Sequence, residues 1–147
     1  MGDLQNHIIK GLMGIVETEL MLLKGKQKTS LEEYMNDIEL QHVVERALQN
    51  AIQACIDIGA RIISRMSFRK AESYHDIFDI LSQYGIIDPN LRDKMHELVG
   101  LRNILVHEYR LIEHREVYRH LRESPIVLEE LAEKIAGFLE RHEEEGA

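Results

Sequence analysis

The segment LVGLRNILVHEY, residues 98–109, carries an arginine, an asparagine, a histidine and a tyrosine at fixed distances within an apolar helical pattern. The arginine Arg102 is followed directly by Asn103, then by His107 and Tyr109. Guanidinium is a permanent cation whose fork matches phosphate oxygens, and imidazole exchanges a proton near neutral pH. An asparagine amide can orient the imidazole or a substrate by hydrogen bonds. This set suits proton transfer and charge stabilisation at a phosphate group.

A helical wheel places the arginine in an apolar environment. With Arg102 at 0° and about 100° per residue, the residues within about 60° of it are Leu91, Met95, Leu98, Leu105 and Tyr109. A guanidinium on the centre line of this stripe needs carboxylates, carbonyls or a phosphate, because an unpaired buried charge is costly. A purely structural interpretation stays open, in which Asp57 or Glu45 neutralises Arg102, His107 is a capped core histidine and Tyr109 is a packed aromatic.

A second, narrow set of residues on the same wheel, which we call the polar strip, consists of His96, Gly100, Asn103 and His107, at about 100° to 160°. Asn103 and His107 are four residues apart and can touch. Arg102 and His107 are about 140° apart, so they do not naturally converge within one chain. Either the helix distorts near His107, or Arg102 reaches around, or a second copy of the strip faces the first. We expect the last two together, with two copies meeting across a two-fold axis and Gly100 and His96 as dimer contacts. Two Arg, two Asn and two His would then line one cleft.

The elements that must position these residues are all predicted to be helices. Only two prolines occur and β-type alternation is absent. An apolar stripe runs from Ile9 to Leu23, and Ser30 followed by Glu33 predicts a capped turn at 31–36. A long helix is expected from Ile38 to Met66, about 40 Å at ~1.5 Å per residue, which is the length of a bundle spine.

Proline and glycine mark the remaining boundaries. A shorter helix at 73–84 is closed by Gly85, and the helix of the signature begins with Asp88 as cap and Pro89 at its first position. A helix over 113–121 and a separate last helix opened by Ser124-Pro125 are expected to follow. The sequence thus predicts one all-α domain over 1–147, an antiparallel bundle of about five helices with its core at 5–140 and a frayed tail at 143–147.

Composition narrows the classes of function. Apolar residues make up 44% of the chain and charged residues 30%, as in a soluble globular protein, and no apolar run approaches the ~18 residues of a membrane span. The net charge of −8 argues against non-specific adhesion to nucleic acid or anionic lipid. The N-terminus has no signal-peptide layout, and the single cysteine, Cys55, fits a small core residue of a protein in the reducing cytoplasm.

Other candidate sites carry weaker signals. Arg61, Arg65 and Arg69 stand four residues apart and could track an RNA backbone along one ridge, although a solvated ridge explains them equally well. The spine helix also carries a polar ridge, which consists of Glu45, Arg46, Gln49 and Gln53. Solvent exposure or a dimer contact explains this ridge adequately. The eight histidines include no His-Glu-x-x-His motif, and no paired cysteines or glycine-rich phosphate loop are present. We therefore predict no metal site and no cofactor.

The segment RNILVHEY resembles the signature of the HEPN superfamily, and the chain is specifically similar to the HepT-like ribonuclease toxins. Two further segments carry the likeness, VVERALQNAIQACIDIGARII at 43–63 and SYHDIFDILSQYGII at 73–87, so that it covers roughly residues 5–140. The resemblance implies a dimeric helical bundle that cleaves RNA without a metal, with Arg102 and His107 catalytic and Asn103 supporting them. It also implies that a cognate nucleotidyltransferase antitoxin adenylylates Tyr109. The overall acidity is a mild misfit with an RNA enzyme.

Two functions from different classes follow. In the first, the chain is a homodimeric endoribonuclease toxin that is neutralised when its partner transfers AMP to Tyr109. In the second, it is a non-catalytic helical accessory protein whose polar strip binds a nucleotide or docks the nucleotidyltransferase. Cleavage of tRNA without added metal, giving fragments that end in a cyclic phosphate, is expected under the first function only.

Overall fold

The fold is entirely helical in the part that the computed structural model describes, the backbone of residues 2–145 and the side chains of residues 4–142. The elements in chain order are α1 (Gly2–Lys26), α2 (Leu31–Met35), α3 (Ile38–Arg65), α4 (Tyr74–Gln83), α5 (Pro89–His107), the short 3₁₀ helix η1 (Tyr109–Leu111) and α6 (His114–Glu145). The prediction of an all-α bundle is confirmed. None of these helices combines the length and apolarity needed to cross a bilayer.

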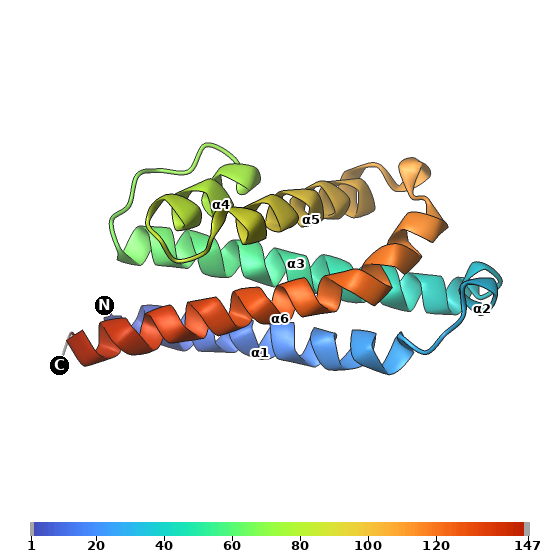
Figure 1. Cartoon of the computed structure of the whole chain (residues 1–147), viewed down its shortest axis with the longest axis horizontal. Helices are drawn as coiled ribbons and strands as arrows, with labels where there is room; N and C mark the ends of the chain where they lie inside the picture. The colour runs from blue at the N-terminus through green and yellow to red at the C-terminus, as the bar shows by residue number, and fades with distance from the viewer. Residues whose placement is uncertain (1, 146–147) are drawn as a thin grey trace.

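Helix α3 is the spine of the bundle. It packs against α1 and α6 on one side and against α4 and α5 on the other (Figure 1). Its apolar residues recur every three or four positions and are fully buried at Val44, Leu48, Ile52, Ile58 and Ile62. This periodicity predicted the helix, and burial of each such side chain stabilises the fold by roughly 1.5–3 kcal/mol.

The helix starts follow the capping residues of the sequence. The side chains of Ser30, Asp37, Ser73 and Asp88 each accept a hydrogen bond from the backbone N–H three residues later. Ser30 Oγ also donates to the Glu33 carboxylate at 3.0 Å, so the two predicted residues pair through their side chains, whereas the reciprocal bond of a capping box would come from the Ser30 backbone N–H. These caps satisfy N–H groups that a helix leaves unpaired at its first turn.

A glycine in the spine lets α4 approach closely. A Cβ at Gly59 would lie 2.5 Å from Ile77 Cγ2 and 3.5 Å from Leu81 Cδ1, a contact that forces a shift of the neighbouring helix. Gly59 therefore fixes how near α4 lies to α3. The position of α4 matters for the site, because its first residue, Tyr74, contacts Arg102.

The predicted break at Ser124-Pro125 is wrong, because α6 runs through Pro125 as one helix. Proline lacks the N–H that would bond the carbonyl of Leu121, and Gln27 Nε2 donates to that carbonyl instead at 3.0 Å. Ser124, expected to be a cap, is hydrogen-bonded to His120 Nδ1 at 2.6 Å. Figure 1 shows a change of direction in the orange part of α6, as expected where a proline interrupts the hydrogen-bond ladder.

The C-terminal tail differs from the expectation in part. Helix α6 continues through residues 143–145, which were expected to fray, and residues 146–147 lie outside the described part of the chain. The N-terminal end of α1 and the C-terminal end of α6 lie at the same end of the bundle (Figure 1).

Candidate functional site

Helix α5 presents the signature residues and ends within the signature. Asp88 accepts from Leu91 N–H at 2.7 Å to begin the helix. At the other end, Glu108 leaves helical geometry, with φ −129° and ψ 46°, after its N–H has bonded the Ile104 carbonyl. The following 3₁₀ turn of η1 is closed by a 2.7 Å bond from Leu111 N–H to the Glu108 carbonyl. His107 is thus the last helical residue, and Tyr109 belongs to the next element.

Arg102 is half-buried and is held by uncharged groups. Its Nε donates to Gln53 Oε1 at 2.8 Å, and its Nη1 donates to Asn103 Oδ1 at 3.0 Å. The guanidinium carbon lies 5.2 Å from the centroid of the Tyr74 ring, in cation–π range. Within the described residues Arg102 makes no ion pair. A direct pair with Asp57 or Glu45 is therefore not formed, and Gln53 stands between Arg102 and Asp57.

Asn103 and His107 are not hydrogen-bonded to each other in the described structure. Asn103 Oδ1 instead accepts from Arg102, a charged donor that makes the stronger hydrogen bond. His107 is exposed at the end of α5. Among the described residues, no hydrogen bond joins His107 to Arg102, in accord with their expected angular separation. One chain supplies the arginine and the histidine on different faces.

Tyr109 lies elsewhere than the helical wheel predicted. It was expected in line with Arg102 because the wheel assumed one continuous helix to residue 109. The helix ends two residues earlier, and the Tyr109 side chain is 74% exposed on η1. The tyrosine is consequently open to solvent, as a modified residue needs to be, and is not packed in the core.

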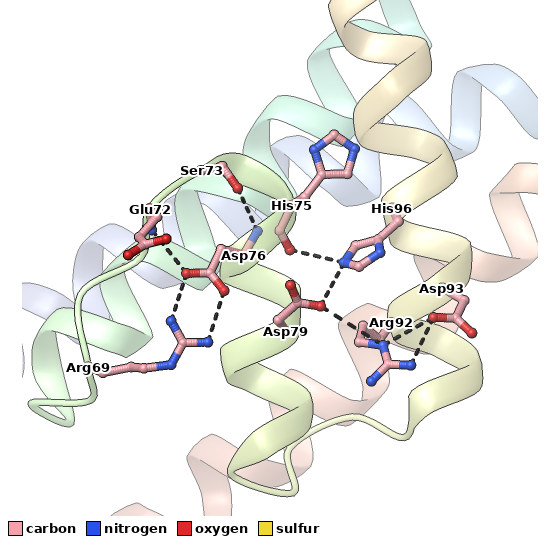
Figure 2. Close-up of polar contacts among 9 residues, drawn as sticks. All are labelled: Arg69, Glu72, Ser73, His75, Asp76, Asp79, Arg92, Asp93 and His96. Carbon is pink, nitrogen blue, oxygen red and sulfur yellow. Dashed lines mark hydrogen bonds and ion pairs between the residues drawn. The ribbon is translucent and has the colours of Figure 1, made fainter.

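His96, the predicted dimer contact, has its ring engaged within the chain. Its Nε2 lies 3.1 Å from the His75 carbonyl and 2.9 Å from Asp79 Oδ1, as Figure 2 shows. Both neighbours are acceptors, so Nε2 carries the proton. Gly100, in contrast, has open space where a Cβ would stand. It borders an open groove of about 420 Å³ between α5, η1 and the start of α6. The dimer contact itself stays a prediction for both residues.

The predicted arginine ridge is wrong in its last member. Helix α3 ends at Arg65, so Arg69 lies in the connection to α4, where it makes a bidentate pair with Asp76 at 2.7 and 2.9 Å (Figure 2). The side chain of Arg65 donates to Asn6 of α1. Arg61 is exposed. Two of the three arginines thus have partners within the chain.

The Arg69–Asp76 pair fixes the start of α4. Asp76 also accepts from the Glu72 backbone N–H at 3.0 Å. These bonds, first the one from Arg69, lower the pKa of the Asp76 carboxyl to about 2. Since Tyr74 occupies the first position of the same helix, the pair also helps to place the ring against Arg102.

A reactive cysteine and a metal centre are two other kinds of site that histidine- and cysteine-containing chains can form. Cys55 is fully buried, and burial raises the pKa of its thiol to about 12, so it is a core residue and not a nucleophile. No group of three or more His, Cys, Asp or Glu side chains within the described residues is arranged to hold a metal ion.

Sequence reasoning missed two of the groups around Arg102. Gln53 was assigned to an exposed ridge and Tyr74 was given no role, yet both contact the guanidinium. The spacing of Gln53 and Asp57, four residues apart on the spine helix, indicates that these two side chains can pair, which would have marked Gln53 as a residue held in place. Tyr74 reaches Arg102 only through the packing of α4, which no local pattern encodes.

Comparison with known proteins decides the family. Residues 4–135, which include the whole signature, match the family model described as Ribonuclease HepT-like. The chain belongs to this family. The resemblance noted in the sequence is confirmed, and the HepT-like assignment covers every element from α1 to most of α6.

Two HepT-like relatives are nucleases by name. The chain is 34% identical over 118 residues to the tRNA nuclease HepT of Aphanizomenon flos-aquae, which is 80% of each chain. It is 38% identical over 77 residues to the mRNA nuclease HepT of Shewanella oneidensis, which is 52% of this chain and 58% of the relative. The two relatives are named for different RNA classes.

Solved HepT-like structures share the fold. A tri-AMPylated HEPN toxin of Shewanella oneidensis in complex with an MNT antitoxin superposes with a TM-score of 0.82 at 26% identity, over 88% of this chain and 97% of that one. The cytosolic protein YutE of Bacillus subtilis gives 0.78 at 27% identity, over 91% and 90%. A toxin–antitoxin structure with AMP-PNP gives 0.77 at 26%, over 87% and 97%.

The anchor of α4 should make the stability of the fold depend on pH. The pKa of Asp76 is lowered on folding, so the carboxylate contributes stability that is present above pH ~4 and is lost as the pH falls toward 2. Asp76→Asn should lower the free energy of unfolding at pH 7 by about 1 kcal/mol or less, the scale of a partly exposed pair. Urea denaturation between pH 7 and pH 2.5 measures the difference from wild type, which should shrink toward zero in acid.

Asp93→Asn provides the control, because Asp93 is an exposed carboxylate on α5 whose ion pair among the described residues is with the adjacent Arg92. It should change the stability little at any pH. A constant difference between Asp76→Asn and wild type across the whole pH range would contradict the assignment of the acid-sensitive term to Asp76.

Proposed function

We propose that this chain is an endoribonuclease toxin, whose active site combines Arg102 and Asn103 with His107 at the interface of a homodimer. The observation that carries the proposal is the state of Arg102. A half-buried guanidinium held only by amide oxygens and an aromatic ring keeps its positive charge available for an anion. Family membership supports RNA as the source of that anion, because HepT-like relatives are named tRNA and mRNA nucleases.

The proposed reaction uses the 2′-hydroxyl of RNA as the nucleophile. The imidazole of His107 takes the hydroxyl proton, the 2′-oxygen forms a bond to the adjacent phosphorus, and the bond from phosphorus to the 5′-oxygen breaks. The leaving 5′-oxygen takes its proton from water, so that each site needs one imidazole and one guanidinium. Arg102 stabilises the negative charge that gathers on the phosphate oxygens. The products carry a 2′,3′-cyclic phosphate and a 5′-hydroxyl, and no step draws on a metal ion.

A homodimer could bring together Arg102 and His107, which lie on different faces of α5 in one chain. No hydrogen bond joins Arg102 to His107 among the described residues, and His107 is exposed at the end of α5. Gly100 has free space above it, so another helix can approach closely at that point of the polar strip. Apposed strips would bring Arg102 of one copy toward His107 of the other.

RNA and the partner would meet this chain at different places. Arg61 is the ridge arginine that stays exposed without a partner within the described residues, and we propose it as the remaining backbone contact. Tyr109, 74% exposed, is the proposed target of a nucleotidyltransferase antitoxin, as the AMPylated toxin–antitoxin relative suggests. The phenolic oxygen would attack the α-phosphate of ATP and release pyrophosphate. Because the proposed substrates are cellular tRNA or mRNA, we expect the protein to act in the cytoplasm.

The catalytic pair is tested by single substitutions. Arg102→Ala and His107→Ala should each lower the rate of tRNA cleavage in EDTA by at least about 100-fold, because the reaction needs both the proton acceptor and the charge. Arg46→Ala and His7→Ala, at exposed positions with no hydrogen bond or ion pair among the described residues, should retain the wild-type rate. Full activity of His107→Ala, or an absolute requirement for a divalent metal, would overturn the proposed chemistry and favour the accessory-protein alternative.

The dimer is tested at Gly100. A Cβ at Gly100 would meet no atom within 4 Å, so the fold of Gly100→Leu should survive while bulk at the interface weakens association by about tenfold or more. Sedimentation velocity should show a shift toward monomer together with loss of cleavage. Gly14→Leu is a matched control, since Gly14 is also a helical glycine with open space above it. An unchanged, active Gly100→Leu dimer would place the interface elsewhere.

Modification is tested by mass. After co-expression with its nucleotidyltransferase, the wild-type chain should gain AMP and lose cleavage, because the added phosphodiester and purine obstruct RNA entry. Tyr109→Phe should gain none and should stay active. Tyr84→Phe, which removes another exposed phenol, should be labelled like wild type. A label that persists on Tyr109→Phe would move the modification to another residue.

A further inference from the structure

The amide of Gln53 has only one orientation that satisfies its neighbours. Its Oε1 accepts from Arg102 Nε at 2.8 Å, and its Nε2 donates to Asp57 Oδ1 at 2.9 Å. Arginine has only donors and an ionised carboxylate has only acceptors. Turning the amide over would oppose two donors at Arg102 and two acceptors at Asp57. Asp57 therefore fixes the direction in which Gln53 presents its oxygen.

The oxygen of Gln53 in turn limits how the guanidinium can rotate. Nε is bound to Gln53 and Nη1 to Asn103, so two of the three nitrogens of Arg102 are held in place. The Tyr74 ring covers the guanidinium at 5.2 Å. Nη2 has no hydrogen bond within the described residues. The arrangement leaves one edge of the fork for an incoming group.

The neutrality of Gln53 matters as much as its position. A carboxylate at 2.8 Å from Nε would neutralise much of the arginine charge, and an amide orients the group without that loss. The nearest acidic group in this chain of hydrogen bonds is the Asp57 carboxylate, which binds the Gln53 amide and not the Arg102 guanidinium. A glutamine that links an acid to an arginine thus combines fixed geometry with retained charge.

We propose that Gln53, oriented by Asp57, is a positioning residue of the RNA-cleaving site, which holds Arg102 so that Nη2 meets the scissile phosphate. This inference rests on the proposed function. Without the Gln53 acceptor, Arg102 would sample several orientations, and binding of RNA would change less than the chemical step.

The first experiment replaces the amide by a side chain of similar length. Gln53→Met in the full-length chain should lower kcat for tRNA cleavage by about 10- to 100-fold, while KM stays within about threefold. Gln49→Met is the matched control, one helical turn earlier on α3, half-buried and without a hydrogen bond in the described structure, and it should leave both constants unchanged. In parallel, the NMR signal of Arg102 Nε–H should lose its protection from solvent exchange in Gln53→Met alone.

A pair of substitutions at Asp57 repeats the test without changing Gln53. Asp57→Asn still offers an amide oxygen to Gln53 and should keep kcat within about threefold. Asp57→Ala removes the acceptor and should lower kcat further than Asp57→Asn does, with circular dichroism showing that both variants are folded. Equal loss in the two variants would mean that only the charge of Asp57 matters, against this inference.

Failure of this inference differs from failure of the proposed function. If Gln53→Met keeps kcat within about threefold of wild type while Arg102→Ala is inactive, Gln53 does not position the arginine and the nuclease site still stands. If Arg102→Ala is itself fully active, the proposed site is wrong, and the positioning role is wrong with it.

Discussion

The constraint on which the site depends is a permanent cation on the inward-facing side of a helix. Arginine cannot lose its proton, so the chain must solvate Arg102 with acceptors or neutralise it. Two amide oxygens and one aromatic ring solvate it, and no carboxylate in the described structure neutralises it. In a structural ion pair, a carboxylate would neutralise the guanidinium, and Arg102 would attract no anionic substrate. This cation is oriented, and its Nη2 has no hydrogen bond to another described residue, so an anionic substrate can bind there.

Several elements of the fold build the environment of Arg102. Helix α3 provides Gln53 and Asp57 from the same face, α4 provides Tyr74 and α5 provides Arg102 and Asn103. Gly59 allows α4 to lie close to α3, and the Arg69–Asp76 pair fixes the first turn of α4. On the other side of the bundle, Gln27 takes the place of the hydrogen bond that Pro125 cannot make, so α6 continues as one element. Packing at several distant points thus determines the environment of one guanidinium.

Local signals in the sequence predicted most of the helices, but they predicted the contacts between helices only in part. Caps at Ser30 and Asp88 and the stripe of α3 gave the correct helices, because capping and periodicity act within a few residues. The wheel failed at Tyr109, since the helix stops two residues before it, and the Ser124-Pro125 signal failed because a distant glutamine compensates the proline. The contact of Tyr74 with Arg102 depends on how α4 docks, which is a tertiary event without a local pattern.

If arginine and histidine act from different copies of the chain, two inactive variants should restore each other's activity when they are mixed in one dimer. Arg102→Ala and His107→Ala are unfolded and refolded together, and tRNA cleavage is measured in EDTA. If the site is composite, the mixed dimers regain one intact site, and the mixture should recover up to about a quarter of the wild-type activity, as random pairing requires. A mixture as inactive as either variant alone, with mixed dimers demonstrated by native mass spectrometry, would contradict the account.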